Sequence, residues 1–295
     1  MNCKDKGIAN AMRTEIYTGL SDYYANLAYN VFKWDWKTEN HIPRKYPEAF
    51  LYSQGLCTVY VPKGMDEPVC LPVAYESLKG NIYGEPQTWK AQAVQGSAPE
   101  GPDGNILNRE NAVLIWNNDT YTATQPYIDT LIGQMVNVEL AKRMNVNAQK
   151  CPFVFKSPNG VKSLQNKQDF VDFLECEPAF FKSDMSDNSF EIFYSNIPMI
   201  AKDLDDVYAE YDSRALQYIG VNCLPVEKKE RLLTDEVNIN TEERNLAIES
   251  KLKQREEACE VMYDILGVEC RVSLGDYTEG KEYTEESEED TEGEE

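Results

Sequence analysis

The sequence predicts an α+β protein in which long helices flank a β-rich lobe and a small β-containing insert. Apolar residues recur at steps of three and four in several long segments, which is typical of amphipathic helices. Short runs of β-branched and aromatic residues lie between them, separated by Pro, Gly and Asn. Of the 295 residues, 42% are hydrophobic and 11% aromatic, so the chain can bury a substantial core.

The first helix is expected within residues 1–36, where Ile16, Leu20, Leu27 and Trp34 follow the helical period. Residues 37–123 form the β-rich lobe. Its clearest strands are expected at 57–61 and 113–116, and residues 96–105 have the composition of a loop.

A second helix is predicted within residues 124–150, starting after Pro126 and ending near Val146. Residues 151–195 then read as a compact α+β insert. Its strands are expected at 151–155, 179–181 and 190–194, and a short helix at 163–173.

A third helix is predicted at 196–220, with Asn196 as its cap, Pro198 in its first turn and Gly220 at its end. A polar connector, 221–239, follows.

The last folded segment is expected at residues 240–274. Asn240 and Glu243 resemble a capping box for a helix over 241–266, and the alternation over 268–274 predicts a half-buried strand.

The charge is strongly negative: 51 Asp and Glu face 29 Lys and Arg, which gives a net charge of −22. Residues 275–295 are expected to be a disordered acidic tail. The balance disfavours a surface that coats nucleic acid. No apolar run approaches the roughly 20 residues that span a bilayer, and the N-terminus lacks a secretory pattern, so we expect an intracellular protein.

The sequence offers little for catalysis, and we expect neither an enzyme nor a cofactor or metal. The single histidine, His41, stands in a loop without a nucleophile motif. No glycine-rich phosphate loop occurs. The eight cysteines include no C-x-x-C pair, so we interpret them as small buried hydrophobes.

Two basic features interrupt the acidic sequence. The connector holds Lys228, Lys229 and Arg231, and the insert holds a scatter of lysines, namely Lys156, Lys162 and Lys167. From charge alone, a solvated turn explains the first group, and the second is unremarkable.

Three stretches in this order and spacing point to a family. Residues 145–152 end the second helix, 227–237 follow the third, and 255–268 lie in and after the fourth. They resemble the upper collar protein, also called the head–tail connector or portal protein, of small short-tailed bacteriophages (podoviruses of the Picovirinae type). The resemblance extends over most of residues 15–274.

The resemblance implies a twelve-subunit ring at one capsid vertex, through which double-stranded DNA enters and leaves. The helices at 124–150 and 196–220 would be stem helices that line the channel. The insert at 151–195 would be an SH3-like clip outside the capsid. The β-rich lobe, with the first helix and residues 240–274, would form the wing.

The resemblance also assigns roles to residues. Residues 221–239 correspond to a channel loop, in which Lys228, Lys229 and Arg231 would contact DNA. The channel-lining stem would present Lys202, Asp203, Asp206 and Glu210. The clip surface with Lys156, Lys162 and Lys167 would face the packaging motor or a packaging RNA.

The sequence departs from the family pattern in two places. Tyr194 and Asp203 stand where the family has lysines near the third helix, and the basic N-terminal arm is reduced to Lys4, Lys6 and Arg13. A ring of lysines deeper in the channel and attachment of packaging RNA are therefore both in question.

The implied protein is a conduit, and a mostly acidic lumen would let DNA slide without gripping it. Its implied partners are other copies of the chain, the DNA, the capsid and scaffolding proteins, the packaging ATPase and RNA, and the lower collar and tail proteins. It would reside in the virion after assembly in the host cytoplasm, without contacting a membrane. The alternative is an acidic intracellular adaptor whose tail binds a basic partner, which would not form rings.

Overall fold

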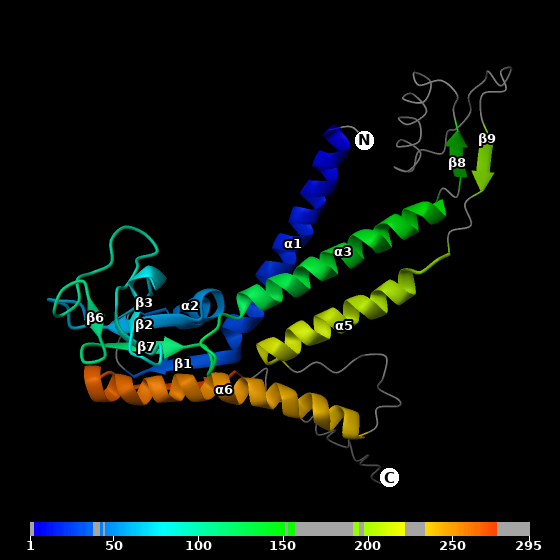
Figure 1. Ribbon diagram of the computed structural model, residues 1–295. Helices are drawn as coiled ribbons and strands as arrows, with labels where there is room; N and C mark the ends of the chain where they lie inside the picture. The colour runs from blue at the N-terminus through cyan, green and yellow to red at the C-terminus, as the bar shows by residue number, and fades with distance from the viewer. Residues whose placement is uncertain are drawn as a thin grey trace, which may run out of the picture. The chain divides into compact units, whose positions relative to one another are not determined.

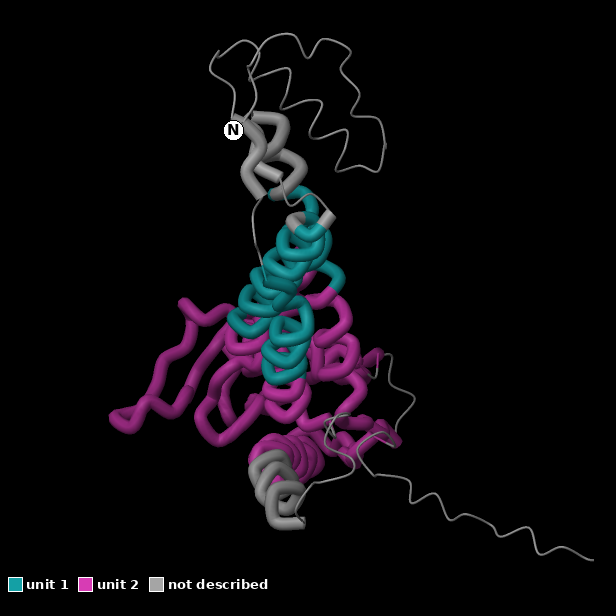
Figure 2. The backbone as a smooth tube through the Cα atoms, turned by 90° about the vertical axis from the view of Figure 1, so that its right-hand side faces the viewer, with its two compact units in different colours: residues 1–19, 130–212 teal, residues 20–129, 213–295 magenta. Residues whose placement is uncertain are grey.

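The computed structural model describes residues 3–37, 42–43, 45–150, 153–156, 191–194, 198–221 and 234–275. Within these ranges, only the backbone is described at residues 3–9, 148, 150, 153–156, 191–194 and 234–244. The fold is of the α+β class, as predicted (Figure 1). The chain divides into two compact units, of which the first comprises residues 1–19 and 130–212 and the second residues 20–129 and 213–295 (Figure 2).

Four of the five α-helices in the described residues are long, with 19 to 33 residues, and the other has nine. Their bounds are α1 Cys3–Val31, α2 Tyr46–Gln54, α3 Gln125–Lys150, α5 Ala201–Ile219 and α6 Thr234–Leu266, with a short 3-10 turn, η1, at Tyr75–Ser77.

The strands are short, and every pair of them is antiparallel. Their bounds are β1 Phe32–Trp36, β2 Leu56–Tyr60, β3 Val69–Pro72, β4 Lys79–Gly80, β5 Pro86–Trp89, β6 Leu107–Asn108, β7 Ala112–Trp116, β8 Phe153–Lys156, β9 Glu191–Tyr194 and β10 Cys270–Leu274.

The first unit contains the start of α1, most of α3, the β8–β9 ribbon and the first part of α5. The strands predicted at 151–155 and 190–194 are present as β8 and β9, paired from Phe153 opposite Tyr194. The predicted helix at 163–173 and strand at 179–181 lie outside the described residues.

The second unit is built around the three-stranded sheet β3–β2–β7. The predicted strands at 57–61 and 113–116 are its members β2 and β7. Helix α2 packs on β2 and β3, and α6 lies against β7 and β10. A second sheet, β4–β5–β6, and the two-stranded ribbon β1–β10 complete the unit.

Strand β2 is buried on both faces and therefore separates two apolar cores. Cys57 and Val59 face the core that α2, α6, β1 and β10 share, whereas Leu56 and Tyr60 face the core lined by β5 and β6. Thr58 is the one polar member of the strand, and its hydroxyl accepts a hydrogen bond from Trp89 Nε1 at 2.9 Å. The bond satisfies both groups in a site without water access.

The first helix ends five residues before the predicted boundary at residue 36. After Val31 the sequence alternates between apolar and polar residues, and this period of two forms strand β1 against β10. Trp34 matches the helical spacing from Val31, yet it lies opposite Val272 in the ribbon and is buried. The spacing alone could not separate these two structures.

Two later helix starts also differ from prediction. Residues 198–200 are not helical, so Pro198 is not in the first turn, and α5 begins at Ala201. Helix α6 begins at Thr234, and Asn240 lies inside it instead of capping it. Threonine followed by two acidic residues suits a helix start. Helix α2 was not predicted; Gly55, with φ +81°, ends it.

A buried ion pair joins the segments of the second unit. Arg255 on α6 donates to Glu48 on α2 through Nε (2.7 Å to Oε1) and Nη2 (2.8 Å to Oε2). Its remaining N–H groups bind Asn117, through the backbone and side-chain oxygens, and the Lys251 carbonyl. Trp34 Nε1 also donates to Glu48, at 2.8 Å. All five guanidinium donors are therefore paired.

The described residues include no helix with an apolar stretch long enough to cross a membrane. The acidic tail predicted at 275–295 lies outside the described residues from Asp276 onward.

The ion pair predicts a specific stability pattern. Arg255→Met and Glu48→Gln should each lower the free energy of unfolding by about 3–5 kcal/mol, because each leaves a buried charge without its partner. The double variant should lose clearly less than the sum, since neither charge remains. Urea denaturation followed by tryptophan fluorescence measures all three values as a double-mutant cycle.

The matched control is Arg109→Met, because Arg109 pairs with Glu85 at 3.7 Å on the surface and both side chains are about half exposed. This change should cost under about 1 kcal/mol. Additive losses at Arg255 and Glu48 would show that the pair is not the coupling element.

Candidate functional site

Helices α3 and α5 run antiparallel in the first unit, and two polar contacts set their register. Asn145 of α3 donates from Nδ2 to the Pro198 carbonyl (2.9 Å), and its Oδ1 accepts from the Ile200 N–H (3.1 Å). Further along α3 in the N-terminal direction, Lys142 pairs with Asp205 at 2.6 Å. A buried side chain on α3 thus fixes the point where α5 begins, in place of the predicted cap at Asn196.

One face of α5 is acidic and exposed. Asp203, Asp206 and Glu210 recur at steps of three and four and therefore share that face, with Lys202 beside them. All four side chains are exposed, whereas Ala201 at the start of the helix is buried. The face presents carboxylates to solvent along about two turns of helix.

The carboxylate of Asp205 lies on the side of α5 that contacts α3. Its hydrogen bond to Lys142 raises the pKa of that lysine, so the lysine remains protonated at neutral pH. The pair ties the two helices together, while the acidic face stays directed away from this contact.

The last turn of α5 lies in the second unit and is closely packed. Gly220 has φ +111°, and a Cβ there would lie 2.8 Å from Ile248 Cγ1, so only glycine fits. The N–H groups of Gly220 and Val221 both bond to the Leu216 carbonyl, each at 2.9 Å. Gly220 thus ends the helix as predicted, and the connector leaves from Val221.

A buried lysine of α6 holds this helix end. Lys251 Nζ donates to the Tyr218 carbonyl at 2.6 Å and lies 3.5 Å from the Ile219 carbonyl. The ammonium also lies 5.0 Å from the Tyr218 ring centre, and the Tyr127 ring contacts the same ring at 4.4 Å. A cation at the C-terminal end of a helix binds carbonyls that have no partner within the helix.

Burial lowers the pKa of Lys251 to about 7, with the nearby Arg255 guanidinium acting in the same direction and Glu48 opposing it. The lysine therefore changes charge near neutral pH, and either charge state can donate to the Tyr218 carbonyl.

The sequence-predicted site residues divide into two groups. Lys202, Asp203, Asp206 and Glu210 are on one exposed helix, as described above. The connector residues Lys228, Lys229 and Arg231 and the insert residues Lys162 and Lys167 lie outside the described residues, and Lys156 is described only as part of the β8 backbone. The roles expected for those basic residues in the channel loop and on the clip surface stay predictions.

Lys251 and Glu48 were not among the residues predicted to have a special role. Arg255 stands in a stretch that carried the family resemblance, but its burial was not anticipated. The available signal was the spacing of Lys251, Arg255 and Cys259, which places all three on one side of α6 beside apolar residues. Within the described part of the chain, no three His, Cys, Asp or Glu groups are arranged to hold a metal.

The fold is that of phage portal proteins. The chain is similar to a chain of the portal and tail of native bacteriophage P68, with a TM-score of 0.51 and 14% sequence identity over 95% of this chain and 93% of that one. An HK97 family phage portal protein from Corynebacterium diphtheriae matches with a TM-score of 0.47 and 8% identity, covering 90% of this chain and 95% of that one. The neck of an empty GTA particle matches with a TM-score of 0.46 and 9% identity, covering 87% of this chain and 80% of that one.

Comparison of the sequence with known protein families identifies the family of this chain. Residues 6–277 match the family described as Phage Connector (GP10), which is most of the chain. The chain therefore belongs to the Phage Connector (GP10) family, and its function is that of a phage portal. This outcome confirms the resemblance, and nothing supports the adaptor alternative.

The lowered pKa of Lys251 predicts a pH-dependent stability. In the unfolded chain a lysine titrates near 10.4, so between pH 7 and about 10 the unfolded state binds more protons than the folded state. The free energy of unfolding should therefore rise with pH in this window, by at most about 1.4 kcal/mol per unit. Urea denaturation from pH 6 to pH 10 of the natural protein and Lys251→Met measures the difference between them.

This difference isolates the contribution of Lys251, because its neighbours Tyr218, Arg255 and Glu48 are present in both proteins. Lys253→Met is the matched control, since Lys253 is exposed and pairs with Glu257 on the same helix. A difference that stays constant from pH 6 to pH 10 would show that Lys251 titrates normally.

Proposed function

We propose that the chain forms a twelve-subunit ring at one capsid vertex and that double-stranded DNA passes through its centre during packaging and ejection. The observation that carries this proposal is the match of residues 6–277 to the Phage Connector (GP10) family. The exposed acidic face of α5 supports it from the chemistry of the chain itself.

The acidic face has the properties that a sliding surface needs. Its carboxylates repel phosphates over about one Debye length, roughly 8 Å at physiological salt. A duplex surrounded by such faces on all sides is held near the axis, without a site at which it is tightly bound. The proposal therefore assigns Asp203, Asp206 and Glu210 to the channel wall, with Lys202 as a local cation.

The role that we assign to each group of basic residues depends on the segment of the chain in which it lies. Lys228, Lys229 and Arg231 lie in the segment between the end of α5 and the start of α6. We assign these residues transient contacts with DNA phosphates. Lys156, Lys162 and Lys167 belong to the insert between α3 and α5, which we assign to the clip that meets the packaging motor or a packaging RNA.

The remaining partners follow from the portal function. We propose that the ring contacts the major capsid and scaffolding proteins, a packaging ATPase, and lower collar and tail proteins. The ring would assemble in the host cytoplasm and remain in the virion. It would move no DNA by itself, because the motor is a separate partner.

Ring formation is the first test. The purified full-length protein should sediment as a high-order oligomer and show closed rings with a central hole in negative-stain micrographs. Protein that remains monomeric over a wide range of salt and concentration would contradict the assembly proposed here and revive the adaptor reading.

DNA contact is the second test, made on purified rings with a short labelled duplex and fluorescence anisotropy. Asp203→Asn/Asp206→Asn should strengthen duplex binding several-fold at about 50 mM salt, because less charge repels the phosphates. Lys228→Ala/Lys229→Ala should weaken it under the same conditions. Both differences should shrink as salt rises.

Each pair has a control of equal charge change in the β-rich lobe. Asp66→Asn/Glu76→Gln matches the acidic pair and Lys63→Ala/Lys90→Ala the basic pair, since all four side chains are exposed. If a test variant and its control bind DNA equally, the effect is one of net charge, and the proposed channel positions are wrong. Rings are confirmed for every variant by sedimentation.

A further inference from the structure

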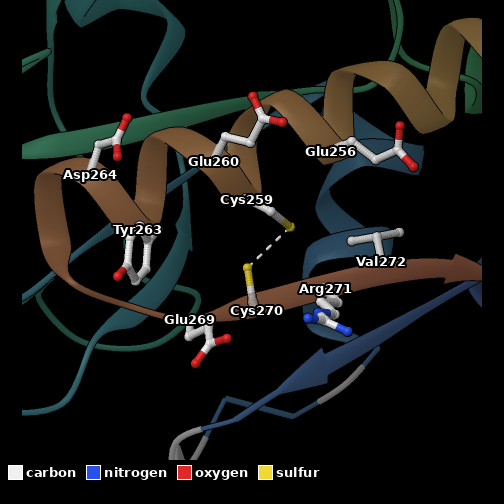
Figure 3. Close-up of a pocket in the computed structure, with 9 residues that line it drawn as sticks. All are labelled: Glu256, Cys259, Glu260, Tyr263, Asp264, Glu269, Cys270, Arg271 and Val272. Carbon is white, nitrogen blue, oxygen red and sulfur yellow. Dashed lines mark hydrogen bonds between the residues drawn. The ribbon is translucent and has the colours of Figure 1, made fainter.

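Two cysteine thiols face each other at the end of α6. Cys259 is on the helix and Cys270 begins strand β10, and their Sγ atoms are 3.1 Å apart (Figure 3). The chain reverses between them at Gly267, whose N–H bonds to the Tyr263 carbonyl at 3.0 Å. The two sulfurs are therefore held together by a helix, a turn and a strand.

The pair opens onto a cavity of about 740 Å³, lined by Glu256, Cys259, Glu260, Tyr263, Asp264, Glu269, Cys270, Arg271 and Val272. Four carboxylates and one guanidinium belong to the residues that line the same space, and three of these carboxylates are on α6. The surroundings thus favour a small molecule with positive charge over one with negative charge.

We propose that Cys259 and Cys270 form a reversible dithiol–disulfide site whose reaction partner is a small cationic disulfide that enters this cavity. The hydrogen bond between the two sulfurs lowers the pKa of Cys270, and the same bond together with burial raises the pKa of Cys259. Cys270 is then the first thiolate, and the thiolate is the nucleophilic form of cysteine.

The reaction balances as two exchanges. The Cys270 sulfur attacks one sulfur of the small disulfide, its S–S bond breaks, and the first small thiolate leaves and takes up a proton. Cys259 then loses its proton and attacks the Cys270 sulfur in the mixed disulfide, releasing the second small thiol. Two protein thiols are oxidised, and one small disulfide is reduced to two thiols. Excess small thiol reverses both steps.

A second pair of cysteines in the same unit shows what distinguishes this site. Cys57 and Cys70 also interact, but their residues are 0% and 6% exposed inside the apolar core. Burial is the main reason that the pKa of Cys57 is raised. Cys57 has no exposed surface and its raised pKa disfavours the thiolate, so we expect this pair to react more slowly than Cys259 and Cys270, which line the cavity.

Closing the disulfide would lock β10 to α6. Strand β10 pairs with β1 along its whole length, and the Gly275 N–H bonds to the Val31 carbonyl at 2.7 Å. The bond would therefore tie the end of α6 to the last described strand, next to the point where the acidic segment 276–295 begins. This proposal does not depend on the DNA channel, because it rests on residues of the second unit alone.

The test treats reduced, full-length protein in its native assembly state with cystamine, a small cationic disulfide, and maps disulfides by proteolysis and mass spectrometry. A peptide pair joined through Cys259 and Cys270 should appear, with the loss of two hydrogens. Oxidised glutathione, which is anionic, should form it at least about fivefold more slowly at low salt, and this ratio should shrink at high salt. The midpoint of thermal unfolding should rise once the bond is closed.

Variants separate this site from the other cysteines. Cys259→Ser should trap a mixed disulfide on Cys270, and Glu256→Gln/Glu260→Gln should speed the reaction with oxidised glutathione. No Cys259–Cys270 peptide, while other cysteines react, would overturn the proposal. Equal rates for the two reagents at low salt would overturn its charge preference. Sedimentation of each variant confirms that assembly is retained.

Discussion

The buried pair of Arg255 and Glu48 is the constraint on which the second unit depends. A guanidinium can be buried only when all its donors find partners, and here those partners come from α2, from the segment after β7 and from α6 itself. Because the bidentate pair has one good geometry, it fixes both the rotation of α6 and its position along the axis. The Phe32 ring, 4.2 Å from the guanidinium carbon, adds β1 to the same junction.

Because the rotation of α6 is fixed at Arg255, the side chains one turn before it and one turn after it are held in defined positions. One turn before Arg255, Lys251 falls on the carbonyls that end α5; one turn after it, Cys259 falls opposite Cys270. Beside these residues on the helix, Ala258 and Met262 fill the apolar core. A single side of α6 therefore holds the end of α5, packs into the apolar core and positions the two thiols. A small rotation of α6 would disturb all three at once, which is why a costly buried charge is a suitable way to define the helix register.

The sequence was most informative where periodicity was long and least informative where a contact between distant residues decided the outcome. The positions of α3 and of the strands β2, β7 and β10 followed from pattern alone, although α3 continues to Lys150 and does not end near Val146 as predicted. The end of α1 did not, because Trp34 fits both a helical and an alternating pattern and only its pairing with Val272 selects the strand. The start of α5 depends on Asn145, more than fifty residues earlier. Glu48 and Arg255 are 207 positions apart, so the sequence does not show that they are partners. Without a visible partner, a charged residue is expected on the surface, and the burial of this pair was therefore not predicted. Of the predicted site residues, those on the acidic face could be placed together, because Asp203, Asp206 and Glu210 are three and four positions apart in one helix.

The net charge of −22 has opposite consequences for assembly and for DNA. In the proposed ring each acidic subunit would repel its neighbours, so the contacts between subunits would have to outweigh that repulsion, and added salt should favour assembly by screening it. Contacts between lysines and phosphates weaken with salt. Assembly and DNA contact therefore respond to salt in opposite directions. The described interior holds two cations, Lys251 and Arg255, together with one carboxylate, Glu48, so these buried charges organise the fold and leave the surface slightly more acidic than the sequence total implies. Such a surface suits the proposed channel, which must let DNA pass without retaining it.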